Sequence, residues 1–124
     1  MIPKSMLLIA TFSALLAGPA MADESSAGAT ELQKCKICHS LDKDGPNRVG
    51  PRLYGVFGRK AAAVPGFNYS DAMKQSGMVW DDKTLADFLR DPKQAMPGNR
   101  MSFPGISDDA TLADLLHRLK QATQ

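Results

Sequence analysis

Hydrophobic residues recur every three or four positions in two stretches of the chain, which is the spacing of the buried face of a helix. One stretch predicts a helix over 82–91, capped by Asp81 and ended by Pro92. The other predicts a last helix that starts at Ser107 or Asp108, with acidic residues in its first turn. The apolar faces are Thr84, Leu85, Phe88 and Leu89 in the first helix and Leu112, Leu115, Leu116 and Leu119 in the second. No run alternates as a strand would, so the pattern favours an all-α domain.

Two further helices are marked less strongly. A helical pattern begins near 27–30 and runs to the cysteines. A short helix over 70–76 is expected, with Ser70 as its N-cap and Gly77 as its stop. The stretch 41–58 is rich in Gly, Pro and Asn and is typical of a loop. Such a long irregular passage inside a compact domain needs a reason, and wrapping a flat cofactor is a good one.

The strongest chemical signal is the run Cys35-Lys36-Ile37-Cys38-His39, a C-x-x-C-H sequence. Two thiols three positions apart on one helical turn can both form thioethers with haem vinyl groups, and the histidine that follows can offer an axial ligand to the iron. The chain has only two cysteines and two histidines, and this run holds both cysteines and one of the histidines. The pattern therefore predicts one covalently attached haem c.

A cysteine pair with this spacing also occurs in three other kinds of site. A thiol redox couple normally follows a strand in a βαβ unit, and no such pattern is visible. A zinc site would need two more ligands, and only His117 remains as an obvious one. A disulfide across two intervening residues would close a very small loop and stabilise little. Each of these alternatives accounts for less of the sequence than haem attachment does.

Residues 1–22 are typical of a secretory signal rather than of a folded domain. Lys4 gives a positive start, residues 6–17 are apolar but short for a membrane span, and Ala20-Met21-Ala22 supplies small residues for cleavage. The expected mature domain is therefore residues 23–124, in the periplasm. The alternative is that the segment is retained as a membrane anchor.

Charge and size narrow the possible partners. The chain has 15 basic and 13 acidic residues, and loss of Lys4 with the signal brings it closer to neutrality. This balance argues against a nucleic-acid partner. A domain of this length buries a limited apolar core, and an attached apolar macrocycle would supply part of what the side chains lack.

A haem iron bound by one histidine needs a second ligand or an open position opposite. His117 stands off the leucine face of the last helix, which is typical of a solvated histidine. Met96 and Met101 lie on the proline-rich loop, and the residues alone do not decide between them. Pro51 has a free carbonyl that could accept the Nδ1 hydrogen of His39, although it could equally be an ordinary turn proline.

The chain resembles the small class I cytochromes c, the mitochondrial carrier and its bacterial periplasmic relatives. The resemblance extends without gaps from Cys35 to Thr123. It rests on Cys35-Lys36-Ile37-Cys38-His39, Val49-Gly50-Pro51, Gly55-Val56-Phe57-Gly58-Arg59-Lys60, Pro65-Gly66-Phe67-Asn68-Tyr69-Ser70-Asp71-Ala72, Thr84-Leu85, Asp91-Pro92-Lys93 and Pro97-Gly98-Asn99-Arg100-Met101. It implies three to five helices around one haem c.

The resemblance also implies roles for individual residues. Met101 matches the distal ligand of the family, and Met96 falls where the family has a packing aliphatic residue. Pro51 takes the position that orients His39. Asn99 replaces a usual threonine near the haem propionates. The positions that hydrogen-bond a buried propionate are matched by Arg59, Tyr69 and Trp80.

The expected function is one-electron transfer by a monomer, not enzyme catalysis. With both axial sites filled by His39 and Met101, the electron would pass through an exposed haem edge. Partners would be a cytochrome bc-type reductase and a terminal oxidase, or a photosynthetic reaction centre. Two alternatives remain open: a dedicated haem c subunit of a periplasmic dehydrogenase or sulfur-oxidising complex, and a haem peroxidase. The basic residues expected to face the partners are Lys34, Lys36, Lys93 and Arg100.

Overall fold

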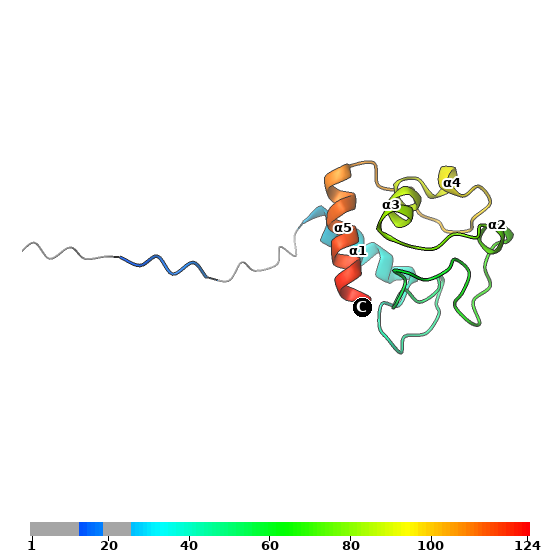
Figure 1. Ribbon diagram of the computed structural model, residues 1–124, viewed down its shortest axis with the longest axis horizontal. Coiled ribbons are helices and arrows are strands. Elements are labelled where there is room, and N and C mark those ends of the chain that lie inside the picture. Colours follow the sequence, from blue (N-terminus) through cyan, green and yellow to red (C-terminus); the bar gives the residue numbers. More distant parts are fainter. Residues whose placement is uncertain (1–12, 19–25) are drawn as a thin grey trace, which may run out of the picture.

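The computed structural model describes residues 13–18 and 26–124, and it is helical (Figure 1). The predicted signal cleavage after Ala22 lies outside the described residues. Among the described residues no helix is both long and apolar enough to cross a membrane. The five helices of this part of the chain are α1 (Ala27–Cys38), α2 (Asp71–Gln75), α3 (Asp82–Arg90), α4 (Pro92–Ala95) and α5 (Asp109–Ala122).

The first and last helices pack against each other at one end of the domain (Figure 1). Gly28 makes the close approach possible, because a β-carbon there would stand 2.2 Å from Asp114 Oδ2 on α5. Ser26 Oγ caps α1 by accepting from Ala29 N at 3.1 Å and donates to the same carboxylate at 2.7 Å. Arg118 Nε donates to both oxygens of Asp114 at 3.1 Å. The start of α1 is therefore tied to α5 by hydrogen bonds as well as by packing.

Helix α3 begins with a capping box, as the sequence predicts at Asp81. Thr84 N donates to Asp81 Oδ1 at 2.8 Å, and Asp81 N donates to Thr84 Oγ1 at 2.8 Å. Pro92 follows the end of α3 and is also the first residue of α4. This single helical turn lies where the sequence predicts a proline-rich loop. Proline is well tolerated at the first helical position, where its missing N–H would have no intrahelical partner, so the same residue serves both purposes.

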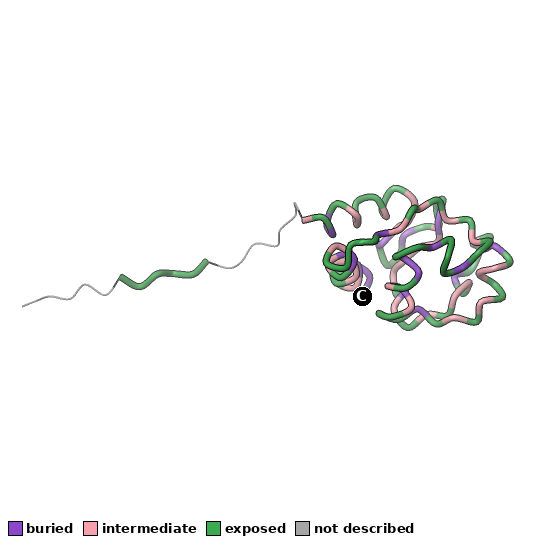
Figure 2. The backbone as a smooth tube through the Cα atoms, turned by 90° about the horizontal axis from the view of Figure 1, so that it is seen from above, coloured by how far each residue is buried: buried purple, intermediate pink, exposed green. Residues whose placement is uncertain are grey.

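The core is built from buried residues of α3 and α5 and of the loops between the helices, and buried positions appear as purple stretches of the tube in Figure 2. Trp80 and Phe88 pack at 5.1 Å between ring centroids with planes at 56°. Leu116, expected on the buried face of α5, lies only partly buried at the edge of this core. The buried cluster consists of Val56, Trp80, Leu85, Phe88, Leu89, Met96, Ile106, Leu112 and Leu115.

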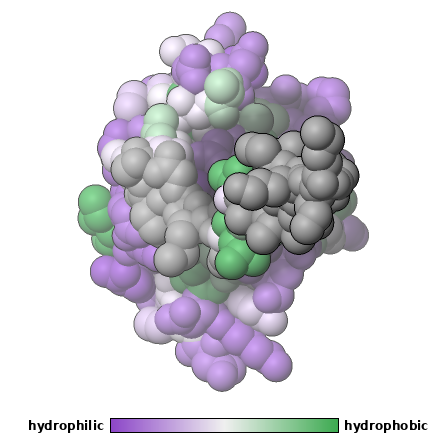
Figure 3. All heavy atoms as spheres, turned by 90° about the vertical axis from the view of Figure 1, so that its left-hand side faces the viewer, coloured by the Kyte–Doolittle hydropathy of each residue, from purple (hydrophilic) through white to green (hydrophobic). Residues whose placement is uncertain are grey.

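Two loop segments far apart in the sequence run antiparallel beside the core. Lys60 and Val79 form an isolated bridge, with Ala61 N donating to Met78 O at 2.8 Å and Trp80 N to Arg59 O at 2.8 Å. Hydrophilic residues make up most of the rim of the face shown in Figure 3. The paired loops hold Arg59 and Trp80 side by side, at one wall of the cavity described next.

Candidate haem site

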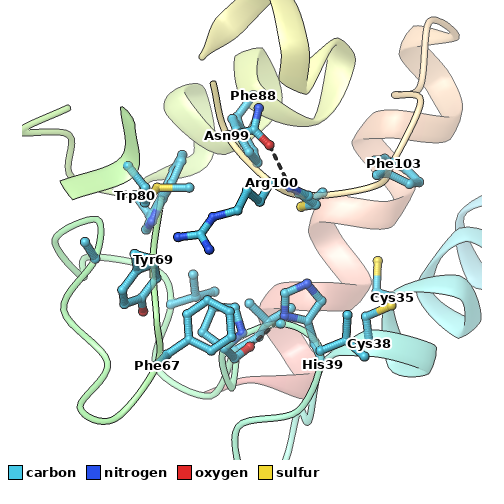
Figure 4. A pocket seen from close by; sticks show the side chains of 18 of the residues that line it. Cys35, Cys38, His39, Phe67, Tyr69, Trp80, Phe88, Asn99, Arg100 and Phe103 are labelled. Atoms are coloured by element: carbon cyan, nitrogen blue, oxygen red, sulfur yellow. Dashed lines mark hydrogen bonds between the residues drawn. The ribbon is translucent and has the colours of Figure 1, made fainter. Parts of the chain in front are cut away.

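A cavity of about 370 Å³ lies between α1, α3 and the long loops. Its volume is within the range of small-molecule and cofactor sites. Cys35, Cys38 and Phe103 stand on one side of it, and Trp80 and Tyr69 stand on the other (Figure 4). Much of its wall is apolar, with lining side chains that include Leu53, Val56, Phe67, Leu85, Phe88 and Leu89. The site is therefore shaped by apolar walls with a few polar groups.

Both cysteines lie on the last turn of α1, where the backbone spacing turns them toward the same cavity. Neither is in a disulfide. Burial raises the pKa of the Cys35 thiol to about 11, with the nearby Glu31 carboxylate adding to the effect. This thiol is neutral at physiological pH, so Cys35 does not have the lowered pKa of a reactive redox cysteine.

His39 follows the cysteines as the C-cap of α1, and its ring orientation is fixed by the loop beneath it. Its Nδ1 lies 2.6 Å from Pro51 O, which is the hydrogen bond expected from the sequence. A carbonyl can only accept, so Nδ1 carries the hydrogen and Nε2 keeps a free lone pair. Burial lowers the pKa of His39, partly offset by this hydrogen bond, which favours the neutral imidazole.

Gly50 completes this arrangement and was not singled out by the sequence analysis. A β-carbon at residue 50 would lie 2.2 Å from His39 Cε1. Its backbone N also donates to Cys38 O at 2.9 Å. Gly50 belongs to the Val49-Gly50-Pro51 motif of the resemblance, but the residues alone do not show why glycine is needed there, because the need arises from the position of the His39 ring.

The structure separates the two loop methionines that the sequence left open. Met101 lines the cavity, whereas Met96 is 5% exposed and belongs to the buried core. His117, which the sequence offers as a possible zinc or iron ligand, is exposed on α5 and is not among the cavity residues. Within the described residues no group of three or more His, Cys, Asp or Glu side chains could hold a metal ion by itself.

The three residues expected near propionates all line the cavity. Arg59 is half-buried, and its guanidinium donates to Tyr54 O at 3.1 Å and to Arg52 O at 3.0 Å. The Tyr69 hydroxyl accepts from Val64 N at 3.1 Å. These bonds hold the side chains in place. A guanidinium has five donors, so Arg59 keeps donors without a partner among residues 26–124.

These residues fit a covalent haem better than any other group considered. The cavity combines two thiols one helical turn apart, a neutral imidazole with a free Nε2, a thioether and apolar walls. Thioethers and imidazoles are ligands of haem iron, and apolar walls suit a porphyrin. An arginine and a tyrosine at another part of the wall suit carboxylates. The site thus defines a c-type haem protein.

Comparison with known proteins supports the assignment of this chain to the c-type haem proteins. No protein-family model matches the chain. Cytochrome c2 of Blastochloris viridis is 40% identical over 103 residues, which cover 83% of this chain and 81% of the relative. Cytochrome c of Gibberella zeae is 43% identical over 91 residues, covering 73% and 86%. The solved structure of cytochrome cH from Methylobacterium extorquens aligns with a TM-score of 0.69 at 45% identity, covering 77% of this chain and 95% of that one.

The chain belongs to the class I cytochrome c family. The fold predicted from the sequence, a small helical domain around one haem, is confirmed. Members of this family are electron carriers rather than enzymes, and their haem c is covalently bound. Cys35 and Cys38 form the attachment motif for it.

Proposed function

We propose that this protein carries single electrons between membrane redox complexes, with His39 and Met101 as the axial ligands of its haem iron. The observation that best supports this is that both residues line the cavity that also receives Cys35 and Cys38. When bound, the haem supplies one iron that alternates between Fe(III) and Fe(II). The protein supplies the attachment, the two ligands and the insulation from water.

The two ligands have different tasks. Pro51 O accepts a hydrogen bond from Nδ1 of His39, which fixes the tautomer of the imidazole. The lone pair of Nε2 is then free to bind the iron. The thioether of Met101 is soft and neutral, which favours Fe(II) and raises the reduction potential. If His39 and Met101 both bind the iron, neither oxygen nor peroxide would have a position to bind, so we propose a carrier and not a peroxidase.

Arg59, Tyr69 and Trp80 are proposed to bind the haem propionates. All three line the cavity, and Trp80 is buried beside the paired loop segments. Arg59 is fixed by two backbone carbonyls, which orients its remaining donors at little further entropic cost. A buried carboxylate needs such donors to offset its desolvation.

The proposed docking surface surrounds the edge of the cavity. Lys34 and Arg100 line the cavity and are exposed, and Lys36 on α1 and Lys93 on α4 are exposed as well. Ile37 and Val49 are 68% and 80% exposed, and the bond from Gly50 N to Cys38 O at 2.9 Å joins the two segments that carry them. A basic rim with an apolar centre suits acidic sites on a cytochrome bc-type reductase, a terminal oxidase or a photosynthetic reaction centre. We place the mature protein, a monomer cleaved after Ala22, in the periplasm.

The decisive experiment is an optical spectrum and redox titration of the exported protein. We expect the pigment to stay with the polypeptide in acid–acetone, a ferric absorption band at the red end of the spectrum from sulfur ligation, and reversible one-electron reduction. Pigment extracted by acid–acetone, or a sixth position that is open in the native protein, would refute the proposal.

Docking is tested by the ionic-strength dependence of electron transfer to a membrane oxidase. Replacing Lys34 and Lys36 by Gln should weaken the reaction at low salt and flatten its salt dependence. Lys74→Gln is the matched control, because Lys74 is exposed on α2 and pairs with Asp71 at 3.3 Å. The same salt dependence in the unsubstituted protein, the variant with Lys34 and Lys36 replaced, and Lys74→Gln would show that the basic residues do not steer docking.

A further inference from the structure

The side chain of Asn99 makes three hydrogen bonds around the residue proposed as the distal ligand. Its Nδ2 donates to Pro92 O at 2.7 Å and to Met96 O at 2.8 Å. Its Oδ1 accepts from Met101 N at 3.0 Å, the contact drawn beside Arg100 in Figure 4. One carboxamide therefore joins both ends of α4 to the backbone of Met101.

The orientation of this carboxamide is fixed by its partners. Both hydrogens of Nδ2 are used by carbonyls, which can only accept, and Oδ1 faces an N–H, which can only donate. Rotating the amide would place oxygen against two carbonyl oxygens and nitrogen against an N–H. Aspartate would have the same shape and would lack both donors, and threonine has a single hydroxyl hydrogen. Asparagine is thus the side chain that meets all three demands.

The two carbonyls belong to a well-anchored part of the chain. Pro92 is fully buried, and Met96 is 5% exposed in the core cluster. Between Met96 and Asn99 the chain turns at Pro97-Gly98, where Gly98 has φ +90° and Asn99 N donates to Met96 O at 3.2 Å. The bond from Asn99 therefore transmits the rigidity of the core to Met101.

The segment after Met101 is held much less. In the part of the chain that the structure describes, the next backbone hydrogen bond after Met101 N is from Ile106 N to Leu89 O at 3.0 Å. Residues 102–105 contain Pro104 and Gly105 and have no backbone bond of their own within that part. Restraint on the Met101 backbone thus comes from its N-terminal side, through Asn99.

We propose that Asn99 is a positioning residue that keeps the Met101 sulfur available as the distal ligand. This inference rests on the proposed ligation by Met101. Loss of the three bonds frees the Met101 backbone while leaving the sulfur chemically unchanged. The expected result is a sulfur that is displaced more easily, with the haem attachment through Cys35 and Cys38 unaffected.

The test uses exported holoprotein and imidazole as a competing ligand. The fraction with sulfur ligation is followed by the red-end ferric band as imidazole is added. We expect Asn99→Ala and Asn99→Asp to bind imidazole about tenfold more tightly than the unsubstituted protein, since two or more hydrogen bonds are lost. Asn99→Thr, which keeps one donor, should fall between them and the unsubstituted protein.

Two control variants separate positioning from general loosening. Gln94→Ala changes an exposed side chain on α4. Asn47→Ala breaks a similar bridge on the His39 side, where Asn47 Nδ2 donates to Pro65 O at 3.0 Å and Oδ1 accepts from Arg52 N at 3.1 Å. Both should keep the imidazole affinity of the unsubstituted protein, even where Asn47→Ala lowers the thermal midpoint.

Three results would overturn the proposal in distinguishable ways. An imidazole affinity in Asn99→Ala no different from that in Gln94→Ala, or an equal rise in Asn47→Ala, would overturn the role of Asn99 alone. Absence of the sulfur band from the unsubstituted protein would overturn the ligation as well. If Asn99→Ala does not accumulate as holoprotein, Asn99→Thr is compared with the same controls by the same criterion.

Discussion

Gly50 lies so close to His39 that a β-carbon on the glycine would stand 2.2 Å from the ring carbon Cε1. The imidazole is thus enclosed between the backbone of residue 50 and the carbonyl of Pro51, 2.6 Å from its Nδ1. Side-chain atoms do not approach to this distance without displacement. The His39 ring can therefore occupy this position only because residue 50 has no side chain.

Gly50→Ala is expected to displace the His39 ring and weaken its bond to Pro51. Overpacking of this kind costs about 1–3 kcal/mol of folding free energy. The measurement is denaturant unfolding of the holoprotein together with its reduction potential. Val49→Ala, at the exposed neighbouring residue, should change neither by a comparable amount. Equal stability of the two variants would show that the loop moves aside without cost.

The two loop methionines should respond differently to the same change. Met101→Leu should abolish the ferric sulfur band and lower the reduction potential, because a leucine cannot bind iron. Met96→Leu should keep the band and cost less than about 1.5 kcal/mol of stability, because the swap conserves volume in the core. Optical spectra of the two holoproteins decide this, and the reverse pattern would exchange the roles assigned to the two residues.

Ala62 is the one non-glycine residue with positive φ, at 60°, in the part of the chain that the structure describes. Ala62→Gly should raise the free energy of unfolding by about 0.5–1 kcal/mol, because relief of the left-handed strain exceeds the greater backbone entropy that glycine has when unfolded. Ala63→Gly, one residue further on at negative φ, should lower it by a similar amount. Thermal or denaturant unfolding of both variants tests the difference in sign.

The contact between the terminal helices should make stability depend on acid. The hydrogen bond from Ser26, followed by those from Arg118, holds the pKa of Asp114 below its ordinary value of 3.8. A carboxyl whose folded pKa is lowered stabilises the fold above its unfolded pKa, and that contribution disappears as the pH falls through the folded pKa. Asp114→Asn should therefore be less stable near neutrality and match the unsubstituted protein in strong acid.

Denaturant unfolding of the holoprotein at both pH values measures this dependence. Asp42→Asn is the control, because Asp42 is exposed and its carboxylate has no hydrogen bond within residues 26–124. Its stability difference from the unsubstituted protein should not change with pH. A difference for Asp114→Asn that stays constant from neutrality to acid would mean that the carboxylate is not what joins the helices.

Much of the fold was predictable because local signals and burial agree. Asp81 caps α3 and Ser70 caps α2 as their sequences indicate, and Leu112, Leu115 and Leu119 are buried as their spacing requires. Helix α4 was missed because proline marks the end of one helix and the first turn of another equally well.

The site was predictable only where chemistry is written in adjacent residues. The attachment motif follows from the residues themselves, whereas the role of Pro51 follows only from the resemblance to the family. The structure places Pro51 O 2.6 Å from His39 Nδ1. The residues alone leave Met96 and Met101 open, and the resemblance to the family favours Met101. The structure adds that Met101 lines the cavity whereas Met96 belongs to the core. The bridge made by Asn99 depends on a turn that brings α4 back beside Met101.

The meeting of α1 with α5 has a consequence for the order of events in biosynthesis. Only Gly28 and Ala29 of α1 are buried, so this helix has little apolar surface of its own and relies on residues near the C-terminus for a partner. A nascent chain is made from the N-terminus, so both thiols emerge long before α5 exists. Until α5 has been synthesised, the helix that carries Cys35 and Cys38 therefore lacks the helix against which it packs, and both thiols remain accessible.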